Sequence, residues 1–252
     1  MNDLRITFCQ QYIVWGDAEA NRRKVEEELG SIPRTTDLFV VPETFTTGFG
    51  NHMASLAEPP EGPTLQWARR MASQHQVLFV GSWVVKEGGA CYNRLHWVRP
   101  DGTYGTYDKG HTFRVSGEAD QISRGTKRTV FEYKGWRIRP AVCYDLRFPK
   151  WLRNDEMCYD LLLVCANWPG SRHEAWSTLL KARAIENLCY VVGCNRIGTD
   201  QEGILYTGDS AAVDYKGFVM AQAEGEQCAS VTLHRDALEA FRHKWPFYLD
   251  FD

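Results

Sequence analysis

The chain has 252 residues and a formal net charge of −3 at pH 7, with 44% hydrophobic and 24% charged residues. This is the composition of an ordinary globular protein, and the length suffices for one large core. The sequence has no long run of Lys and Arg, which argues against a nucleic-acid-binding surface. It also lacks an apolar run approaching the roughly 18 residues that indicate a membrane span.

The eight cysteines predict free thiols and no disulfides. They show no C-x-x-C spacing, and several, including Cys9, Cys165 and Cys194, lie in apolar strand-like runs. A thiol in such a run is usually a small core residue. The chain starts directly with the strand-like segment Leu4–Phe8 and has no signal-peptide pattern. We therefore expect a reducing compartment, the cytoplasm.

The predicted elements alternate between strands and helices along the chain. Strands are expected at 4–10, 38–41, 77–85, 91–98, 104–107, 129–133, 136–142, 161–166, 190–194, 210–214, 219–223 and 229–232. Helices are expected at about 17–29 with Asp17 as the cap, from 63 onward, and at 149–156, 174–187 and 233–241. The segment 114–127 has little periodicity and predicts a long loop, which at this length is often functional. Because no repeat or linker interrupts the pattern, we expect a single domain over residues 1–252.

The stretch 137–149 is predicted to run from a strand into a helix. Pro140 indicates a strand edge or a bulge, and Asp145 could cap the following helix. Cys143 is therefore expected where a strand ends, and catalytic groups gather at such strand ends in open α/β proteins. From this stretch alone, an inert buried thiol is the more common alternative.

Two other strand ends carry a charged residue that would complement a thiol. Glu43 follows the strand 38–41, and Lys109 follows the strand 104–107. Taken singly, each is better explained as a solvated loop residue. Together with Cys143 they supply the groups that acyl transfer to a thiol requires. Glu43 would be the general base, Lys109 the cation that stabilises the oxyanion along with a backbone N–H, and Cys143 the nucleophile. Loss of ammonia would leave a thioester, which water then hydrolyses.

Three segments resemble the signature segments of the nitrilase (carbon–nitrogen hydrolase) superfamily, in the same order. They are Pro42-Glu43-Thr44-Phe45, Tyr107-Asp108-Lys109-Gly110-His111-Thr112-Phe113 and Cys143-Tyr144-Asp145-Leu146-Arg147-Phe148-Pro149. The stretches Ala182–Asn187 and Gly208–Ser210 also fit. The resemblance implies a four-layer α-β-β-α sandwich with Glu43, Lys109 and Cys143 as the catalytic triad. It further implies that Glu118 orients Lys109 or positions the substrate, the alternative being an exposed loop acid.

Within the superfamily, the stretch Cys143–Phe148 is most similar to the ω-amidase type, and Asn167-Trp168-Pro169 also fits it. The resemblance then implies hydrolysis of 2-oxoglutaramate or 2-oxosuccinamate to the acid and ammonia. The alternatives are an amidase acting on N-carbamoyl compounds or deaminated glutathione, and a binding protein without catalysis. The expected partners are the small amide and water, with neither nucleic acid nor membrane.

Four residues beside the motifs are candidates for substrate binding. Arg147 could hold the anionic end of the substrate, because a guanidinium binds a carboxylate with two hydrogen bonds; alternatively it braces the catalytic glutamate. Phe113, Tyr144 and Trp168 could form the pocket walls, or they could be ordinary core residues.

We expect neither a cofactor nor a metal in the reaction. The seven histidines are scattered, without the H-x-x-x-H or H-E-x-x-H spacing of metallohydrolases, and the sequence has no nucleotide-binding fingerprint. The segment 245–251 is too aromatic for a solvated tail. It either packs on its own domain or, as the resemblance favours, docks across a homodimer.

Overall fold

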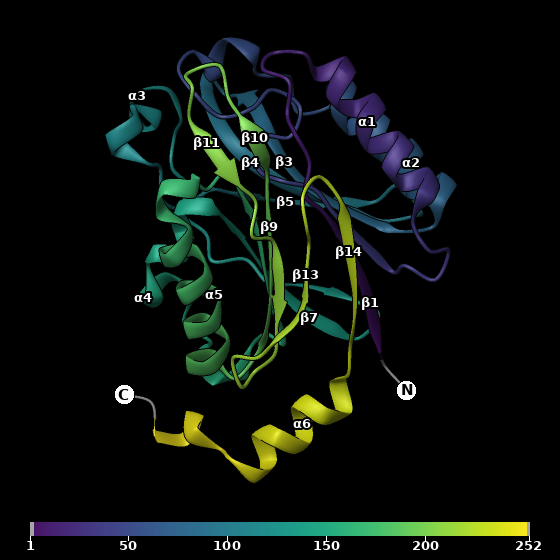
Figure 1. Cartoon of the computed structure of the whole chain (residues 1–252), viewed down its shortest axis with the longest axis vertical. Coiled ribbons are helices and arrows are strands. Elements are labelled where there is room, and N and C mark those ends of the chain that lie inside the picture. Colours follow the sequence, from purple (N-terminus) through teal and green to yellow (C-terminus); the bar gives the residue numbers. More distant parts are fainter. Residues whose placement is uncertain (1–2, 251–252) are drawn as a thin grey trace.

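The structure is a computed structural model that describes residues 3–250 and contains two six-stranded sheets (Figure 1). The first sheet has the order β14 (Cys228–Leu233), β1 (Leu4–Cys9), β2 (Leu38–Val40), β3 (Leu78–Glu87), β4 (Ala90–Val98) and β5 (Tyr104–Asp108). The second has the order β13 (Val219–Gln222), β12 (Ala211–Val213), β9 (Tyr190–Asn195), β8 (Leu161–Ala166), β7 (Trp136–Val142) and β6 (Phe131–Tyr133). The strands β10 (Ile197–Thr199) and β11 (Leu205–Thr207) form a separate hairpin.

Helices α1 and α2 cover the outer face of the first sheet, and α5 covers that of the second. The helices of the described residues are α1 (Ala18–Ser31), α2 (Pro63–His75), α3 (Glu118–Gln121), α4 (Pro149–Leu152), α5 (His173–Asn187) and α6 (Arg235–Lys244). In Figure 1, α1 and α2 lie on one side of the molecule and α5 on the other. Asp17 caps α1 as predicted, since its Oδ1 accepts a hydrogen bond of 2.9 Å from Ala20 N.

The layers follow from the alternation of side chains along the strands. In β2, Leu38 and Val40 point into the core between the two sheets, while Phe39 points into the core beneath α1 and α2. On the far side, Leu162 and Val164 of β8 pack against Trp176 and Leu180 of α5 in a third core. Each fully buried side chain of this kind contributes about 1.5–3 kcal/mol to folding. The predicted four-layer α-β-β-α sandwich is confirmed.

Within each sheet, the parallel strands have their carboxyl ends at the same edge. β1, β2 and β3 are parallel to one another, as are β7, β8 and β9. Pro140 fits its strand because β6 pairs with β7 only from Trp136 to Ile138, so the proline lies beyond that pairing.

Two predictions about local structure are wrong, and one element was missed. The helix expected at 149–156 ends at Leu152, because the buried Asn154 amide bonds Tyr159 N and O and holds the chain in a turn. The expected loop 114–127 contains the 3₁₀ turn η2 (Arg114–Ser116) and α3. The hairpin β10–β11 was not predicted, since its strands are short and largely exposed.

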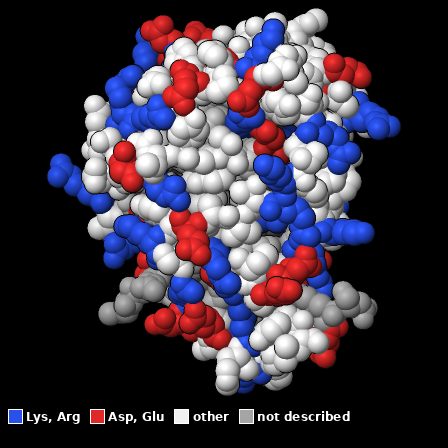
Figure 2. Space-filling view, turned by 180° about the vertical axis from the view of Figure 1, so that it is seen from behind, with Lys and Arg blue, Asp and Glu red and all other residues white. Residues whose placement is uncertain are grey.

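Charged side chains are mixed on the surface. Figure 2 shows Lys and Arg interspersed with Asp and Glu on the face turned away from the viewer in Figure 1. Within residues 3–250, no helix combines the length and the apolar character needed to cross a membrane.

Candidate active site

Glu43, Lys109 and Cys143 each follow a strand, and these strands come from both sheets. Glu43 lies shortly after β2 and Lys109 directly after β5 in the first sheet, whereas Cys143 directly follows β7 in the second. Lys109 and Cys143 line one pocket, and Glu43 lies behind it with no exposed surface. The fold thus brings together the three side chains that the sequence analysis singled out.

The Glu43 carboxylate is held by three donors. Its Oε1 accepts hydrogen bonds of 2.8 Å from Lys109 Nζ and of 2.8 Å from Asn93 Nδ2. Its Oε2 accepts a bond of 2.8 Å from Asn167 N, which follows β8 of the second sheet. Both oxygens therefore have a fixed orientation, as a general base requires.

The Lys109 ammonium lies between two buried carboxylates. Nζ donates to Glu118 Oε1 and Oε2, both at 2.9 Å, in addition to Glu43. Burial by itself would lower the pKa of Lys109, but Glu118 and Glu43 outweigh it and raise that pKa above its ordinary value. Lys109 therefore stays a cation, and Glu118 is a buried partner of Lys109 and not an exposed loop acid.

Cys143 begins the 3₁₀ turn η3 (Cys143–Arg147) with a left-handed backbone, φ +41°. A non-glycine residue in this region is strained, and such strain concentrates at functional sites. The thiol Sγ lies 3.6 Å from Asn167 O. Burial and the Glu43 carboxylate raise the pKa of Cys143 well above its ordinary value, and Lys109 only partly opposes them. The resting side chain is a neutral thiol, so a nucleophilic role requires a base.

Asp145 does not cap a following helix, contrary to the prediction. Its buried carboxylate accepts bonds from Val142 N (3.1 Å), Tyr107 OH (2.7 Å) and His111 N (2.9 Å). These contacts join the turn that carries Cys143 to the loop that carries Lys109. The helix α4 instead begins at Pro149, the residue type that suits a first turn.

A pocket of about 700 Å³ opens onto Lys109 and Cys143. All four predicted substrate-binding residues line it, namely Phe113, Tyr144, Arg147 and Trp168. The sequence analysis missed Arg172 and the hairpin residues Asp200, Glu202, Ile204 and Tyr206, which also line it.

Two arginines of the pocket lie over aromatic rings. The Arg147 guanidinium carbon is 4.7 Å from the Trp168 ring centre, and that of Arg172 is 5.4 Å from the Phe113 ring centre. Among the described residues, neither guanidinium has a hydrogen-bond or ion-pair partner, and Arg147 makes no bond to Glu43. The structure therefore contradicts the alternative that Arg147 braces Glu43.

Other missed residues hold the site in place. Asn93 is a polar residue within an otherwise half-apolar strand, a pattern that could have indicated a buried polar contact. Asn167 was noted only as part of a motif, yet its Nδ2 also donates to Glu43 O at 2.7 Å. At the pocket mouth, Asn51 Nδ2 donates to Glu202 Oε1 at 2.9 Å and so ties the loop after β2 to the β10–β11 hairpin.

The two supporting stretches named in the sequence analysis also contact the site. Arg183 Nη2 donates to Leu146 O at 2.8 Å and so supports the turn after the nucleophile. Gly208 has φ +80°, a backbone conformation that favours glycine. Its O accepts a hydrogen bond of 2.7 Å from Asn195 Nδ2, and Asn195 Oδ1 accepts one of 2.7 Å from N of the pocket residue Trp168.

Comparison with known proteins identifies the family. The model of the family described as carbon-nitrogen hydrolase matches residues 5–243. The chain belongs to the carbon–nitrogen hydrolase family. It is therefore a hydrolase acting on carbon–nitrogen bonds, and the predicted superfamily is confirmed.

Individual relatives cover the same length. The chain is 45% identical to omega-amidase YafV of Yersinia enterocolitica over 254 residues, which is 100% of this chain and 98% of that protein. It is 32% identical to 2-oxoglutaramate amidase of Bacillus subtilis over 224 residues, 87% of this chain and 86% of that protein. A crystal structure of XC1258 from Xanthomonas campestris, a CN-hydrolase superfamily protein with an arsenic adduct in its active site, superposes with a TM-score of 0.97 at 42% identity. That superposition covers 100% of this chain and 98% of the other.

Proposed function

We propose that the protein is an ω-amidase. It hydrolyses the ω-amide of a short 2-oxo dicarboxylic acid, such as 2-oxoglutaramate or 2-oxosuccinamate, to the acid and ammonia. The relatives named omega-amidase and 2-oxoglutaramate amidase support this assignment. The structural observation that carries it is a pocket with a thiol, an ammonium and two guanidiniums. Within residues 3–250, these guanidiniums stack on aromatic rings but have no hydrogen-bond or ion-pair partner.

Acylation begins with transfer of the Cys143 proton to Glu43. The sulfur then attacks the amide carbon, and the electron pair of the carbonyl moves onto its oxygen. The Lys109 ammonium and a backbone N–H at the start of η3 stabilise this oxyanion, because the first N–H groups of such a turn have no partner within it. The tetrahedral intermediate expels the amine, which takes the proton from Glu43 and leaves as ammonia. The product is a thioester on Cys143.

Deacylation repeats these roles with water. Glu43 takes a proton from the water, the oxygen attacks the thioester carbon, and the oxyanion again lies against Lys109. Collapse of the intermediate breaks the carbon–sulfur bond, and the sulfur recovers the proton from Glu43. Neither step requires a metal or a cofactor.

Glu118 acts as a positioning residue through Lys109. In the resting site the ammonium is shared between Glu43 and Glu118. When Glu43 becomes protonated it loses its charge and holds Lys109 less strongly, while Glu118 keeps its charge. The ammonium is therefore released toward the substrate at the moment when the oxyanion forms.

The far end of the substrate is bound by Arg147 and Arg172. An amide placed at Cys143 leaves the 2-oxo acid group several ångströms away, still within the pocket. A guanidinium holds a carboxylate in a bidentate geometry, and each charged hydrogen bond of this kind contributes about 1.5–3 kcal/mol. Phe113 and Trp168 hold the two guanidiniums in place, and with Tyr144 they form walls that exclude larger amides.

A comparison of substrates tests the proposal. The specificity constant kcat/KM is measured for 2-oxoglutaramate, for an N-carbamoyl amino acid, for deaminated glutathione and for a simple nitrile. We expect 2-oxoglutaramate to give the largest value. If one of the others is clearly preferred, the ω-amidase assignment is wrong even if Cys143 is the nucleophile. If none is hydrolysed, the substrate is a carbon–nitrogen compound outside this panel and the ω-amidase assignment is wrong.

The arginines provide a second, internal test. Arg147→Gln should reduce kcat/KM for 2-oxoglutaramate by about tenfold or more, since a lost charged hydrogen bond costs about 1.5–3 kcal/mol. The same variant should leave hydrolysis of a small neutral amide within about twofold, because that substrate has no carboxylate to bind. Equal losses for both substrates would contradict carboxylate binding. Arg172→Gln is examined in parallel.

We also propose that the protein forms a homodimer in the cytoplasm. Trp245, Phe247 and Leu249 are 46%, 52% and 71% exposed, so the part of the aromatic C-terminal segment that the structure describes is not packed into its own domain. Phe251 lies outside the described residues. Docking across two copies would cover this surface. The cytoplasm follows from the cysteine spacing alone.

A further inference from the structure

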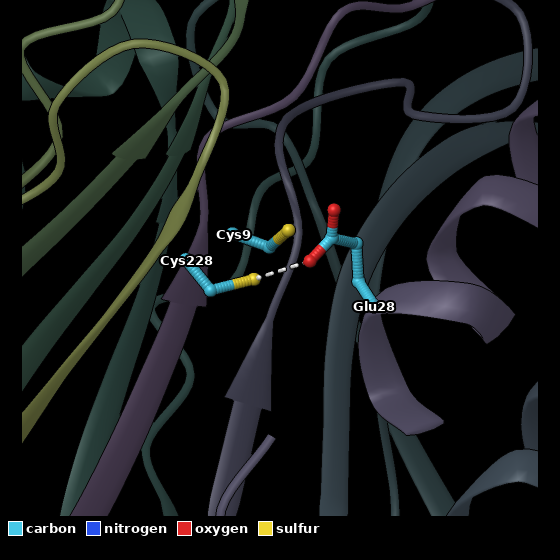
Figure 3. A group of neighbouring side chains, drawn as sticks. All are labelled: Cys9, Glu28 and Cys228. Carbon is cyan, nitrogen blue, oxygen red and sulfur yellow. Dashed lines mark hydrogen bonds between the residues drawn. The ribbon is translucent and has the colours of Figure 1, made fainter. Parts of the chain in front are cut away.

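Two cysteines and a glutamate converge at the edge of the first sheet, outside the active site. Cys9 is the last residue of β1, Cys228 is the first residue of β14, and Glu28 lies on α1. Their sulfur and carboxylate oxygen atoms lie within 4.8 Å of one another. Figure 3 shows the three side chains pointing toward a common centre, with a bond of 3.5 Å from Cys228 Sγ to Glu28 Oε2.

Strand pairing forces the two thiols together. Cys9 and Cys228 are directly opposite each other in the antiparallel pair β1–β14. The adjacent pair is joined by the bond from Gln10 N to Gln227 O, so Cys9 and Cys228 form a non-hydrogen-bonded pair. Side chains approach most closely in such pairs, and here both project toward the face that α1 covers.

The Glu28 carboxylate has no cation to balance its charge. Among the described residues its side chain has only the Cys228 thiol as a partner. Lys24, one turn earlier on α1, is paired with Glu226 instead. A bound cation would supply the positive charge that the described surroundings of Glu28 lack.

We propose that Cys9, Glu28 and Cys228 form a zinc-binding site. In a tetrahedral site with bonds of about 2.0–2.3 Å, the ligand atoms are about 3.6–3.8 Å apart, so only a small contraction of this cluster is needed. Two thiolates select a soft or borderline cation, and the carboxylate favours Zn²⁺ over Cu⁺ among these. Cys9 is 1% exposed, but Glu28 and Cys228 are only partly buried, so the cluster borders solvent, which would supply the fourth ligand as water.

The role of this site is structural. Its three ligands come from the first strand, the first helix and the last strand of the sandwich. A bound ion would fasten the edge strand β14 and α1 to β1. The site lies on the helix-covered face of the first sheet, whereas Cys143 follows a strand of the second sheet, so zinc would stabilise the fold without entering the chemistry.

Cobalt binding provides the test, because thiolate–Co²⁺ coordination has an absorption band in the near ultraviolet. The full-length protein, kept reduced, is titrated with CoCl₂ and then with ZnCl₂. The Cys143→Ala background removes the catalytic thiol as a competing ligand. We expect one equivalent of Co²⁺ with a thiolate band that Zn²⁺ abolishes, and a higher melting temperature with Zn²⁺.

Matched variants locate the site. Cys9→Ser and Cys228→Ser should each remove the thiolate band and the stabilisation by Zn²⁺. Glu28→Gln keeps the shape of a partly exposed side chain, so it is informative even if the cysteine variants fold poorly; it should weaken binding by about tenfold or more. Cys91→Ser and Cys158→Ser change partly exposed thiols outside the cluster and should bind like the parent.

Three results would overturn the proposal. One is the absence of Co²⁺ and Zn²⁺ binding by the reduced protein. Another is binding that persists in Cys9→Ser and Cys228→Ser. The third is a Cys9–Cys228 disulfide, found by mass spectrometry of the untreated protein, together with a reduced form that binds no metal; the two thiols would then be a redox pair.

Discussion

Replacing Lys109 by Met should abolish catalysis and also destabilise the fold. The ammonium is 1% exposed, and the side chains of both its carboxylate partners are 0% exposed. Loss of one oxyanion donor reduces kcat by about a hundred- to a thousandfold, or about 2.7–4 kcal/mol. Removing the cation also leaves two buried carboxylates without compensation, and breaking a buried ion pair in this way costs about 3–5 kcal/mol of stability.

A second substitution separates the two effects. In Lys109→Met combined with Glu118→Gln, one of the uncompensated charges is gone, so part of the lost stability should return. Ammonia release should remain lost, because no cation faces the oxyanion. Activity is measured as ammonia release at saturating 2-oxoglutaramate, and the free energy of unfolding is measured by urea titration.

The pH dependence of the stability loss follows from the direction of the pKa shift. The folded-state pKa of Lys109 lies above its ordinary value. Its stabilising contribution is therefore fully present below that ordinary value and is lost only as the pH rises through the folded-state pKa. Burial also raises the folded-state pKa of Glu118, and removal of the opposing Lys109 charge raises it further, so Lys109→Met loses stability as this carboxyl ionises. The stability difference between wild type and Lys109→Met should therefore grow as the pH rises from about 6 to 9. The reasoning fails if Lys109→Met retains more than about a tenth of the wild-type kcat, or if the double variant recovers activity along with stability.

Further predictions concern the nucleophile, its base, metal removal and assembly. Cys143→Ala should abolish ammonia release and Cys143→Ser should be nearly as inactive, with an acyl adduct on Cys143 visible by mass spectrometry of quenched wild-type turnover; substantial turnover by Cys143→Ala would refute the thioester mechanism. Labelling of Cys143 by iodoacetamide should change little between about pH 7 and 9 in wild type, whereas in Glu43→Gln it should rise about tenfold per pH unit, because only direct ionisation remains and burial still raises the thiol pKa after the Glu43 charge is removed. A flat profile in Glu43→Gln would show that Glu43 is not the base. Activity should survive a chelator at temperatures where the protein stays folded, and a loss of kcat without unfolding would argue for a metal in the reaction. Light scattering at micromolar concentration should give a dimer, and a monomer would refute the proposed pairing.

The sequence pattern was sufficient for most strands and helices, and it singled out Glu43, Lys109 and Cys143 at strand ends. The four layers were implied only by the resemblance to the superfamily. Runs such as Leu38–Val41 are apolar at every position, which is what a strand buried on both faces requires, and the cap at Asp17 has a direct local cause. Glu118 could be placed near Lys109 only by resemblance to the superfamily. Its contact with Lys109 depends on the short helix α3, which an aperiodic segment does not predict.

The parts that failed depend on contacts between distant segments. Asp145 looked like a helix cap because it precedes a helical segment, but its partners Tyr107 and His111 lie 38 and 34 residues away. Arg172 gave no signal because it lies in the short 3₁₀ turn Gly170–Arg172, and only the folded chain places it at the pocket. The β10–β11 hairpin is short and exposed, so its role as a pocket wall has no counterpart in a hydrophobic pattern.

The contact between Glu43 and Asn167 should make catalytic activity depend on complete folding. These residues are 124 positions apart and belong to different sheets, yet the peptide N–H of one fixes the carboxylate of the other. Under the proposed mechanism, a chain in which only one sheet has formed holds either Glu43 or Cys143 in its working position, but not both. Such an intermediate should not hydrolyse amides, and activity should require that the two sheets have packed together. For the same reason, hydrogen exchange at Asn167 N should follow global unfolding and not local fraying.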